Sequence, residues 1–147
     1  MIGIKGWEVN TLEAKRFAQI GEKIANIRID HNSTVTAMAA VNTTDIALDF
    51  RFTANYTGMG FIKIEGRIVI SDDSKVPETV VREWKKTGNM PSDFANVVHN
   101  AIMANCIPTA ILVSRDIQLP PPVPLPQVDV SQQRPPDNKS AKGMEVA

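Results

Sequence analysis

Cysteine is nearly absent from this sequence, in which Cys106 is the only one among 147 residues. A lone thiol cannot form an internal disulfide, so nothing in the chain requires an oxidising compartment. The N-terminus lacks the basic stretch followed by an apolar stretch that marks a signal peptide. No run approaches the roughly 18 to 20 apolar residues of a membrane helix. We therefore expect a cytoplasmic protein that does not engage the membrane.

An excess of either charge is also lacking. Lys and Arg together number 16, as do Asp and Glu, so the net charge is near zero. This balance argues against nucleic acid as the main partner, and its weak self-repulsion permits self-association. The alternative of RNA or ribosome association rests on four basic residues, Lys63, Arg67, Lys85 and Lys86.

Motifs for catalysis, cofactors and metals are missing. Neither His31 nor His99 lies in a ligand or acid–base motif, and Cys106 is expected to be a packed, inert thiol. The Gly-rich link at residues 57–60 joins two expected strands, which excludes a dinucleotide loop. Asp72-Asp73 could bind a cation, but the Glu at the last position of a calcium loop is missing, so we expect a solvated turn. The sequence predicts a protein that is not an enzyme and has no cofactor.

Two segments show the alternation of half-buried strands. Residues 44–57 carry an apolar side chain at every second position, and residues 62–70 repeat this pattern. The link at residues 57–60 supplies a turn, so the two strands should pair as an antiparallel hairpin. Gly66 falls in the apolar series, where glycine marks a bulge or the close approach of another element. The apolar positions are Ile46, Leu48, Phe50, Phe52, Ala54, Tyr56, Ile62, Ile64, Ile68 and Ile70.

The pattern upstream is weaker. Residues 24–32 and 34–41 read as two strands separated by a turn at residues 31–33, or as one long strand with a bulge. Residues 2–20 alternate poorly, and residues 12–20 could form a helical turn or two. The expected core residues of this region are Ile27, Ile29, Val35 and Val41.

Two helices should follow the strands. Pro77 is typical of a first helical turn, and Gly88 of the position just past a helix end. A second helix should begin at Ser92, a suitable N-cap, and carry a broad apolar face. Pro108 should kink this helix or start a new one that continues to Ile117. Strands in a run followed by helices predict an α+β fold with an antiparallel sheet of about four strands, covered on one face.

Proline is concentrated near the C-terminus. Five of the eight residues from Leu119 to Pro126 are Pro, which excludes a helix or a central strand and favours polyproline II. Residues 129–147 are polar, and we expect disorder there. The chain should therefore comprise an α+β domain at residues 1–118, a proline-rich arm at residues 119–128 and a disordered tail at residues 129–147.

Two interpretations of the arm remain open. As a polyproline II ligand it would be bound by a partner domain, which would make the protein an adaptor. Its interleaved apolar residues favour instead an arm that docks along the domain or a neighbouring subunit. The aromatic residues of the strand at 44–57 suit a core, or a groove that binds polypeptide. The candidate polypeptide-binding residues are Phe50, Phe52, Tyr56, Leu119, Val123 and Leu125.

Three segments carry a resemblance to known proteins. Ile64-Glu-Gly-Arg-Ile68, Glu83-Trp-Lys-Lys86 before Met90-Pro91, and the proline run 119–126 resemble an uncharacterised archaeal protein family over about residues 8–128. The layout of four strands, a long helix and an apolar proline-containing segment is similar to that of the export chaperone SecB. The resemblance implies a SecB-like fold that associates into dimers or tetramers and holds unfolded polypeptides in apolar grooves. SecB docks on its translocation motor through a strongly acidic surface, and the neutral charge balance here argues against such docking.

Overall fold

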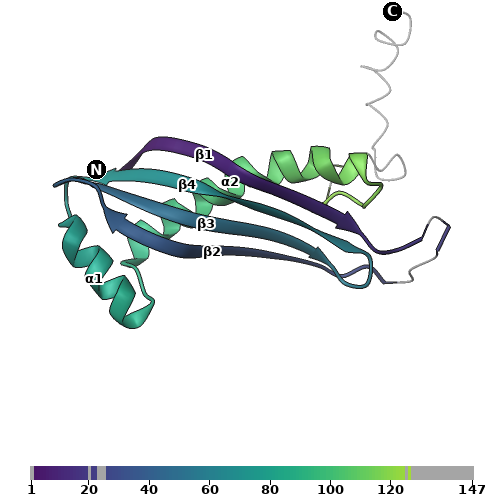
Figure 1. The fold of residues 1–147 in the computed structure, drawn as a ribbon, viewed down its shortest axis with the longest axis horizontal. Helices are drawn as coiled ribbons and strands as arrows, with labels where there is room; N and C mark the ends of the chain where they lie inside the picture. The colour runs from purple at the N-terminus through teal and green to yellow at the C-terminus, as the bar shows by residue number, and fades with distance from the viewer. Residues whose placement is uncertain (1, 20, 23–25, 125, 127–147) are drawn as a thin grey trace, which may run out of the picture.

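The structure, a computed structural model, describes residues 2–19, 21–22, 26–124 and 126. Its sheet contains β1 (Ile2–Arg16), β2 (Ile29–Ala40), β3 (Asp45–Tyr56) and β4 (Gly60–Asp72). Every neighbouring pair is antiparallel, in the order β1-β4-β3-β2. The helices α1 (Pro77–Thr87) and α2 (Ser92–Asp116) follow, and α2 crosses one face of the sheet (Figure 1). This α+β architecture confirms the predicted fold.

The β3–β4 hairpin forms as the alternation predicts. The residues of β3 and β4 that face α2 are buried, whereas those between them are exposed or half-buried. Gly58 in the turn has a φ of 76°, a left-handed conformation that glycine adopts without strain. Phe94, Val98 and Ile102 of α2 are fully buried and complete the core on this face. The opposite face carries ion pairs, such as Arg67 with Asp49 at 2.8 Å.

The segment at residues 29–40 is one strand with a bulge between Val35 and Ala37. This confirms the single-strand alternative, so the predicted turn at residues 31–33 is wrong. Ile27 and Val41 are 41% and 58% exposed, which corrects their expected place in the core, whereas Ile29 and Val35 are half-buried. Met38, only 5% exposed, is the core residue that the pattern missed.

Residues 12–16 belong to strand β1, so the helical turns considered for residues 12–20 are wrong over this part. Its register with β4 shifts between Ile4 and Gly6 and again between Val9 and Thr11. Each bulge adds one residue and reverses the alternation, which explains why the strand pattern was hard to recognise. Residue 20 lies outside the described residues.

Helix α2 continues through Pro108 as a single helix, so the alternative in which Pro108 starts a new helix is wrong. Proline removes the hydrogen bond to the carbonyl four residues earlier, at Ala104. Both residues are exposed, so water can satisfy that carbonyl. Ser92 is the first helical residue and makes no cap hydrogen bond, because Pro91 occupies the N-cap position. Gly88, with a φ of 77°, ends α1 as predicted.

Candidate functional site

The three aromatic candidates from β3 lie in the core. Phe50, Phe52 and Tyr56 are 1%, 0% and 1% exposed. The Trp7 ring stacks on Phe50 with centroids 4.6 Å apart, which seals that side of the core. Phe50 and Phe52 therefore offer a bound polypeptide no accessible surface in this structure, whereas the Tyr56 hydroxyl contacts the chain's own proline arm.

The proline arm docks on the domain over its described part. Leu119 is 5% exposed, Pro122 is buried and Val123 is half-buried. The Tyr56 hydroxyl donates a 2.6 Å hydrogen bond to the Pro120 carbonyl, and His31 Nε2 is bonded to the Pro122 carbonyl. These contacts favour the docked arm over a free adaptor ligand. The candidate Leu125 lies outside the described residues.

A row of apolar side chains on β1 is exposed, and we call it the β1 stripe: Ile4, Val9 and Leu12. The register pairs these residues with Ile70, Gly66 and Ile64, which are buried on the α2-facing side of the sheet. Directly paired residues project from the same face of an antiparallel sheet. The stripe therefore extends the core face of the sheet past the area that α2 covers.

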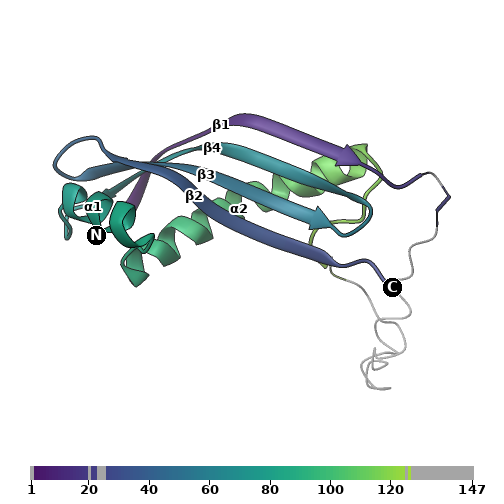
Figure 2. The same ribbon diagram turned by 60° about the horizontal axis from the view of Figure 1, so that its bottom comes forward.

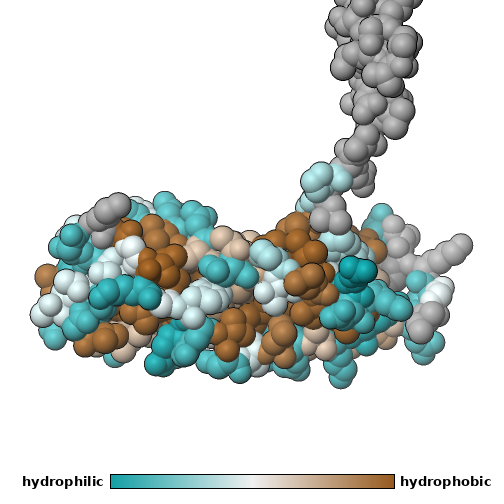
Figure 3. All heavy atoms as spheres, turned by 90° about the horizontal axis from the view of Figure 1, so that it is seen from above, coloured by the Kyte–Doolittle hydropathy of each residue, from teal (hydrophilic) through white to brown (hydrophobic). Residues whose placement is uncertain are grey.

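The stripe residues are 49%, 47% and 51% exposed, in chain order. β1 is an edge strand, and α2 lies diagonally across the sheet (Figures 1 and 2). Viewed from above, the surface shows several apolar patches, separated by hydrophilic residues (Figure 3). Apolar side chains left uncovered along one edge form a surface suited to a partner.

Helix α2 also exposes an apolar ridge, consisting of Ala104, Pro108 and Leu112. These residues are spaced four apart, so they lie along one side of the helix, and Leu112 is 66% exposed. By length and composition α2 also meets the criteria for a membrane-spanning helix, which the core helix of a globular domain can meet too. Seven of its residues are buried in this structure, so α2 serves as a core helix with one apolar side left open.

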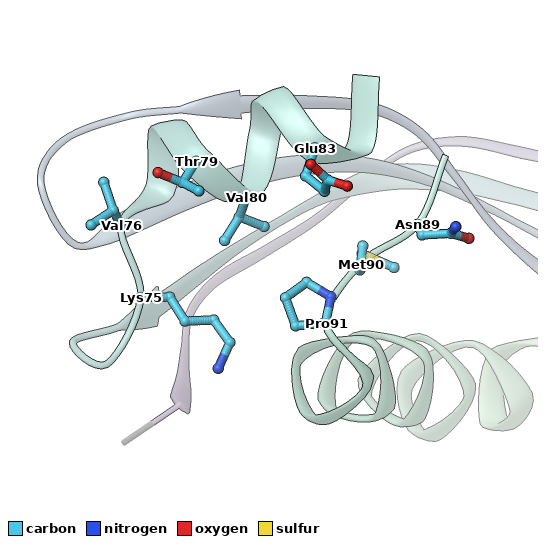
Figure 4. A pocket seen from close by; sticks show the side chains of 8 residues that line it. All are labelled: Lys75, Val76, Thr79, Val80, Glu83, Asn89, Met90 and Pro91. Atoms are coloured by element: carbon cyan, nitrogen blue, oxygen red, sulfur yellow. The ribbon is translucent and has the colours of Figure 1, made fainter. Parts of the chain in front are cut away.

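An apolar pocket of about 600 Å³ lies between α1 and the start of α2 (Figure 4). Val76, Val80, Met90 and Pro91 form much of its wall. Lys75 at its rim bonds Asp93 at 2.7 Å, and it lies 3.6 Å from Asp72. Lys75, Asp72 and Asp93 are therefore paired with one another at this rim.

Asp72 is 1% exposed and accepts bonds from the Ser74 backbone and hydroxyl, at 2.9 and 2.5 Å. This corrects the expectation of a solvated turn at this residue. The aspartate instead holds the turn that leads from β4 towards α1.

Chemically reactive groups are held in inert settings. The Cys106 side chain is buried, and this burial raises the pKa of its thiol to about 12. His99 Nδ1 is 2.8 Å from the Ser33 hydroxyl, a contact that joins α2 to β2. Across the described ranges, no group of three or more His, Cys, Asp or Glu could hold a metal ion.

The basic residues considered for RNA binding do not form one free patch. Lys63 pairs with Glu13 at 3.1 Å, and Arg67 pairs with Asp49. Lys85 and Lys86 lie on α1 and are exposed. Carboxylates thus neutralise Lys63 and Arg67 on the sheet, which weakens the electrostatic basis for RNA association.

No family model matches the chain, and no curated protein matches it at a significant level. The resemblance to the archaeal family therefore stays a prediction. Among solved structures, the fold is similar to that of the Mycobacterium tuberculosis SecB-like chaperone Rv1957 in complex with a ChAD peptide from the HigA1 antitoxin Rv1956. The TM-score is 0.54 at 10% identity, covering 87% of this chain and 88% of that one. At this identity the likeness establishes a SecB-like fold and leaves the activity open.

Proposed function

We propose that this protein binds unfolded polypeptides through the β1 stripe, as a non-enzymatic, chaperone-like protein. The observation that carries the proposal is that Ile4, Val9 and Leu12 lie on the core side of the sheet while about half exposed. Unfolded chains expose apolar side chains that folded proteins bury, and such side chains could cover the stripe. The complex of the SecB-like chaperone Rv1957 with a peptide supports the proposal by analogy of fold.

The stripe by itself is too small for strong binding. Burying the remaining exposed half of each stripe side chain would contribute about 1 kcal/mol, or about 3 kcal/mol for all three. A Kd of 1 mM already corresponds to about 4 kcal/mol. Useful affinity for a client therefore needs several stripes or additional surfaces acting on one chain.

Self-association supplies that multiplicity, and we assign it to the α2 ridge. Pairing Leu112 and its neighbours with the same ridge of a second copy would cover them and bring two stripes into one assembly. A near-zero net charge opposes such pairing only weakly. The cytoplasm remains the expected location, which the single buried cysteine fits.

Fluorescence anisotropy of a labelled, permanently unfolded protein tests the proposal, with its folded form as the control client. We expect saturable binding of the unfolded form alone. Val9→Ser together with Leu12→Ser should weaken this binding about tenfold, since about 1 to 2 kcal/mol of apolar burial is lost.

Val41→Ser is the matched control variant, because Val41 is a 58% exposed valine outside the stripe. It should leave the client affinity unchanged. Equal binding of the folded and unfolded forms, or equal weakening by both variants, would contradict the proposal.

A further inference from the structure

The chain reverses direction directly after α2. Gln118 has a φ of 58°, and it is the one residue other than glycine with a positive φ in the described ranges. The Leu119 amide donates to the Ser114 carbonyl at 2.8 Å, and the Arg16 guanidinium bonds the Gln118 carbonyl. Figures 1 and 2 show the segment after α2 returning towards the sheet. The start of the arm is thus held back against the domain by a tight reversal.

The arm occupies a groove at the beginning of β2, which we call the arm groove. Its walls come from Ile27, Ile29 and His31, and the arm contributes Pro121, Pro122, Val123 and Pro124. A space of about 500 Å³ remains between wall and arm, within the range of ligand sites. The arm therefore leaves room for further polypeptide alongside it.

Two of the arm's carbonyls accept hydrogen bonds from side chains of the sheet. Tyr56 donates to Pro120 at 2.6 Å, and His31 Nε2 contacts the carbonyl oxygen of Pro122 and must carry the proton, since a carbonyl only accepts. Carbonyls are present in every polypeptide, and proline offers no N–H. These two bonds hold the arm by its backbone, while Leu119, buried in the core, anchors the start of the arm.

We propose that the arm is the chain's own ligand in a second polypeptide-binding groove, from which an extended apolar segment of a client displaces it. This inference rests on the proposed binding of unfolded polypeptides and adds a site to it. Gln118 is the hinge, because a left-handed conformation is strained for a residue with a side chain and release relaxes it. Displacement would couple client binding to movement of the C-terminal segment.

The test supplies the arm in trans. A labelled synthetic peptide with the sequence of residues 119–126 is titrated into the full chain and into two variants. Leu119→Ala removes the buried anchor of the resident arm, whereas Val41→Ala shortens an exposed apolar residue that does not line the arm groove. We expect Leu119→Ala to bind the peptide at least tenfold more tightly than the wild type does, and Val41→Ala to bind it like the wild type.

The unfolded client should then compete the peptide from Leu119→Ala. Equal peptide binding by Leu119→Ala and the wild type would overturn the inference, as would a client that binds fully without displacing the peptide. A peptide that binds while no client does would instead contradict the proposed function and the client's role in this groove.

A second measurement covers a failure of Leu119→Ala to fold. A dye on Val123→Cys reports the arm in the otherwise wild-type chain, since Val123 is half-buried in the arm groove, and Cys106 is buried and will not be labelled. Saturating unfolded client should shift the dye emission towards that of a solvent-exposed dye. Client binding without this shift would show that the arm stays docked.

Discussion

Gly66 fixes the distance between β1 and β4, and its replacement by alanine should disrupt that pairing. A Cβ atom at Gly66 would lie 2.0 Å from the Glu8 carbonyl oxygen and 3.0 Å from Phe50 Cε1. Contacts under 3.0 Å essentially never occur, so β1 must move by at least 1 Å. The nearest atom belongs to the backbone and cannot rotate away as a flexible side chain would.

The cost follows from what this movement breaks. A shift of 1 Å stretches adjacent ladder hydrogen bonds beyond a normal N···O distance of about 3 Å. Losing about two of them costs about 1 to 3 kcal/mol. Weakening the stacking of Trp7 on Phe50, whose centroids are 4.6 Å apart, adds about 0.5 to 1.5 kcal/mol. We therefore expect Gly66→Ala to lower the free energy of unfolding by about 2 to 4 kcal/mol.

Urea unfolding followed by circular dichroism measures this difference. Gly3→Ala is the matched control, since Gly3 lies in β1, the strand that pairs with β4, and a Cβ there meets nothing within 4 Å. That variant should change the free energy of unfolding by less than about 1 kcal/mol. If Gly66→Ala were as stable as Gly3→Ala, the close approach of β1 to Gly66 would be refuted.

Three further predictions concern the arm, the acid stability and the ridge. Burial raises the pKa of Tyr56 to about 12. The contribution of the neutral Tyr56 side chain to folding stability is therefore complete below about pH 10 and is lost as pH rises towards 12. Tyr56→Phe should therefore be less stable than the wild type at pH 8, by a margin that shrinks between pH 10 and 12 in denaturant titrations. Hydrogen bonds from Asn42 and Lys5 hold the pKa of Asp45 well below its usual range. The wild type should thus be more stable than Asp45→Asn at pH 6, and that advantage should fade as unfolding is measured at decreasing pH below about 4. Leu112→Lys should lower the molar mass measured by light scattering, because it places a charge on the α2 ridge; an unchanged oligomer would exclude the ridge as the interface.

The hairpin and the helix order could be predicted because local pattern determines them. In β3 and β4 the alternation is uninterrupted, and one face is buried throughout. β1 was missed because bulges at Lys5 and Asn10 twice reverse its alternation. With the bulges included, Ile4, Trp7, Val9 and Leu12 all fall on the side of the core. Sequence spacing alone does not reveal such bulges.

The site depends on contacts between residues far apart in the chain, which spacing does not encode. The alternation of β3 correctly placed Phe50 and Phe52 on an apolar face, but only the position of α2 shows that this face is covered. Docking of the arm depends on Tyr56 meeting Pro120, 64 residues later. The interleaved apolar residues of the arm were the one feature of the sequence that favoured its docking on the domain.

Photo-crosslinking from a defined position tests client binding at the β1 stripe most directly. A photoreactive amino acid replaces Leu12 in the stripe or, in a separate variant, Asn55 on the opposite face of the sheet, where the side chain is also exposed. After illumination with a labelled unfolded protein, we predict crosslinked product from position 12 and none above background from position 55. Equal crosslinking from both positions, or crosslinking from position 55 alone, would contradict the assignment of polypeptide binding to the stripe.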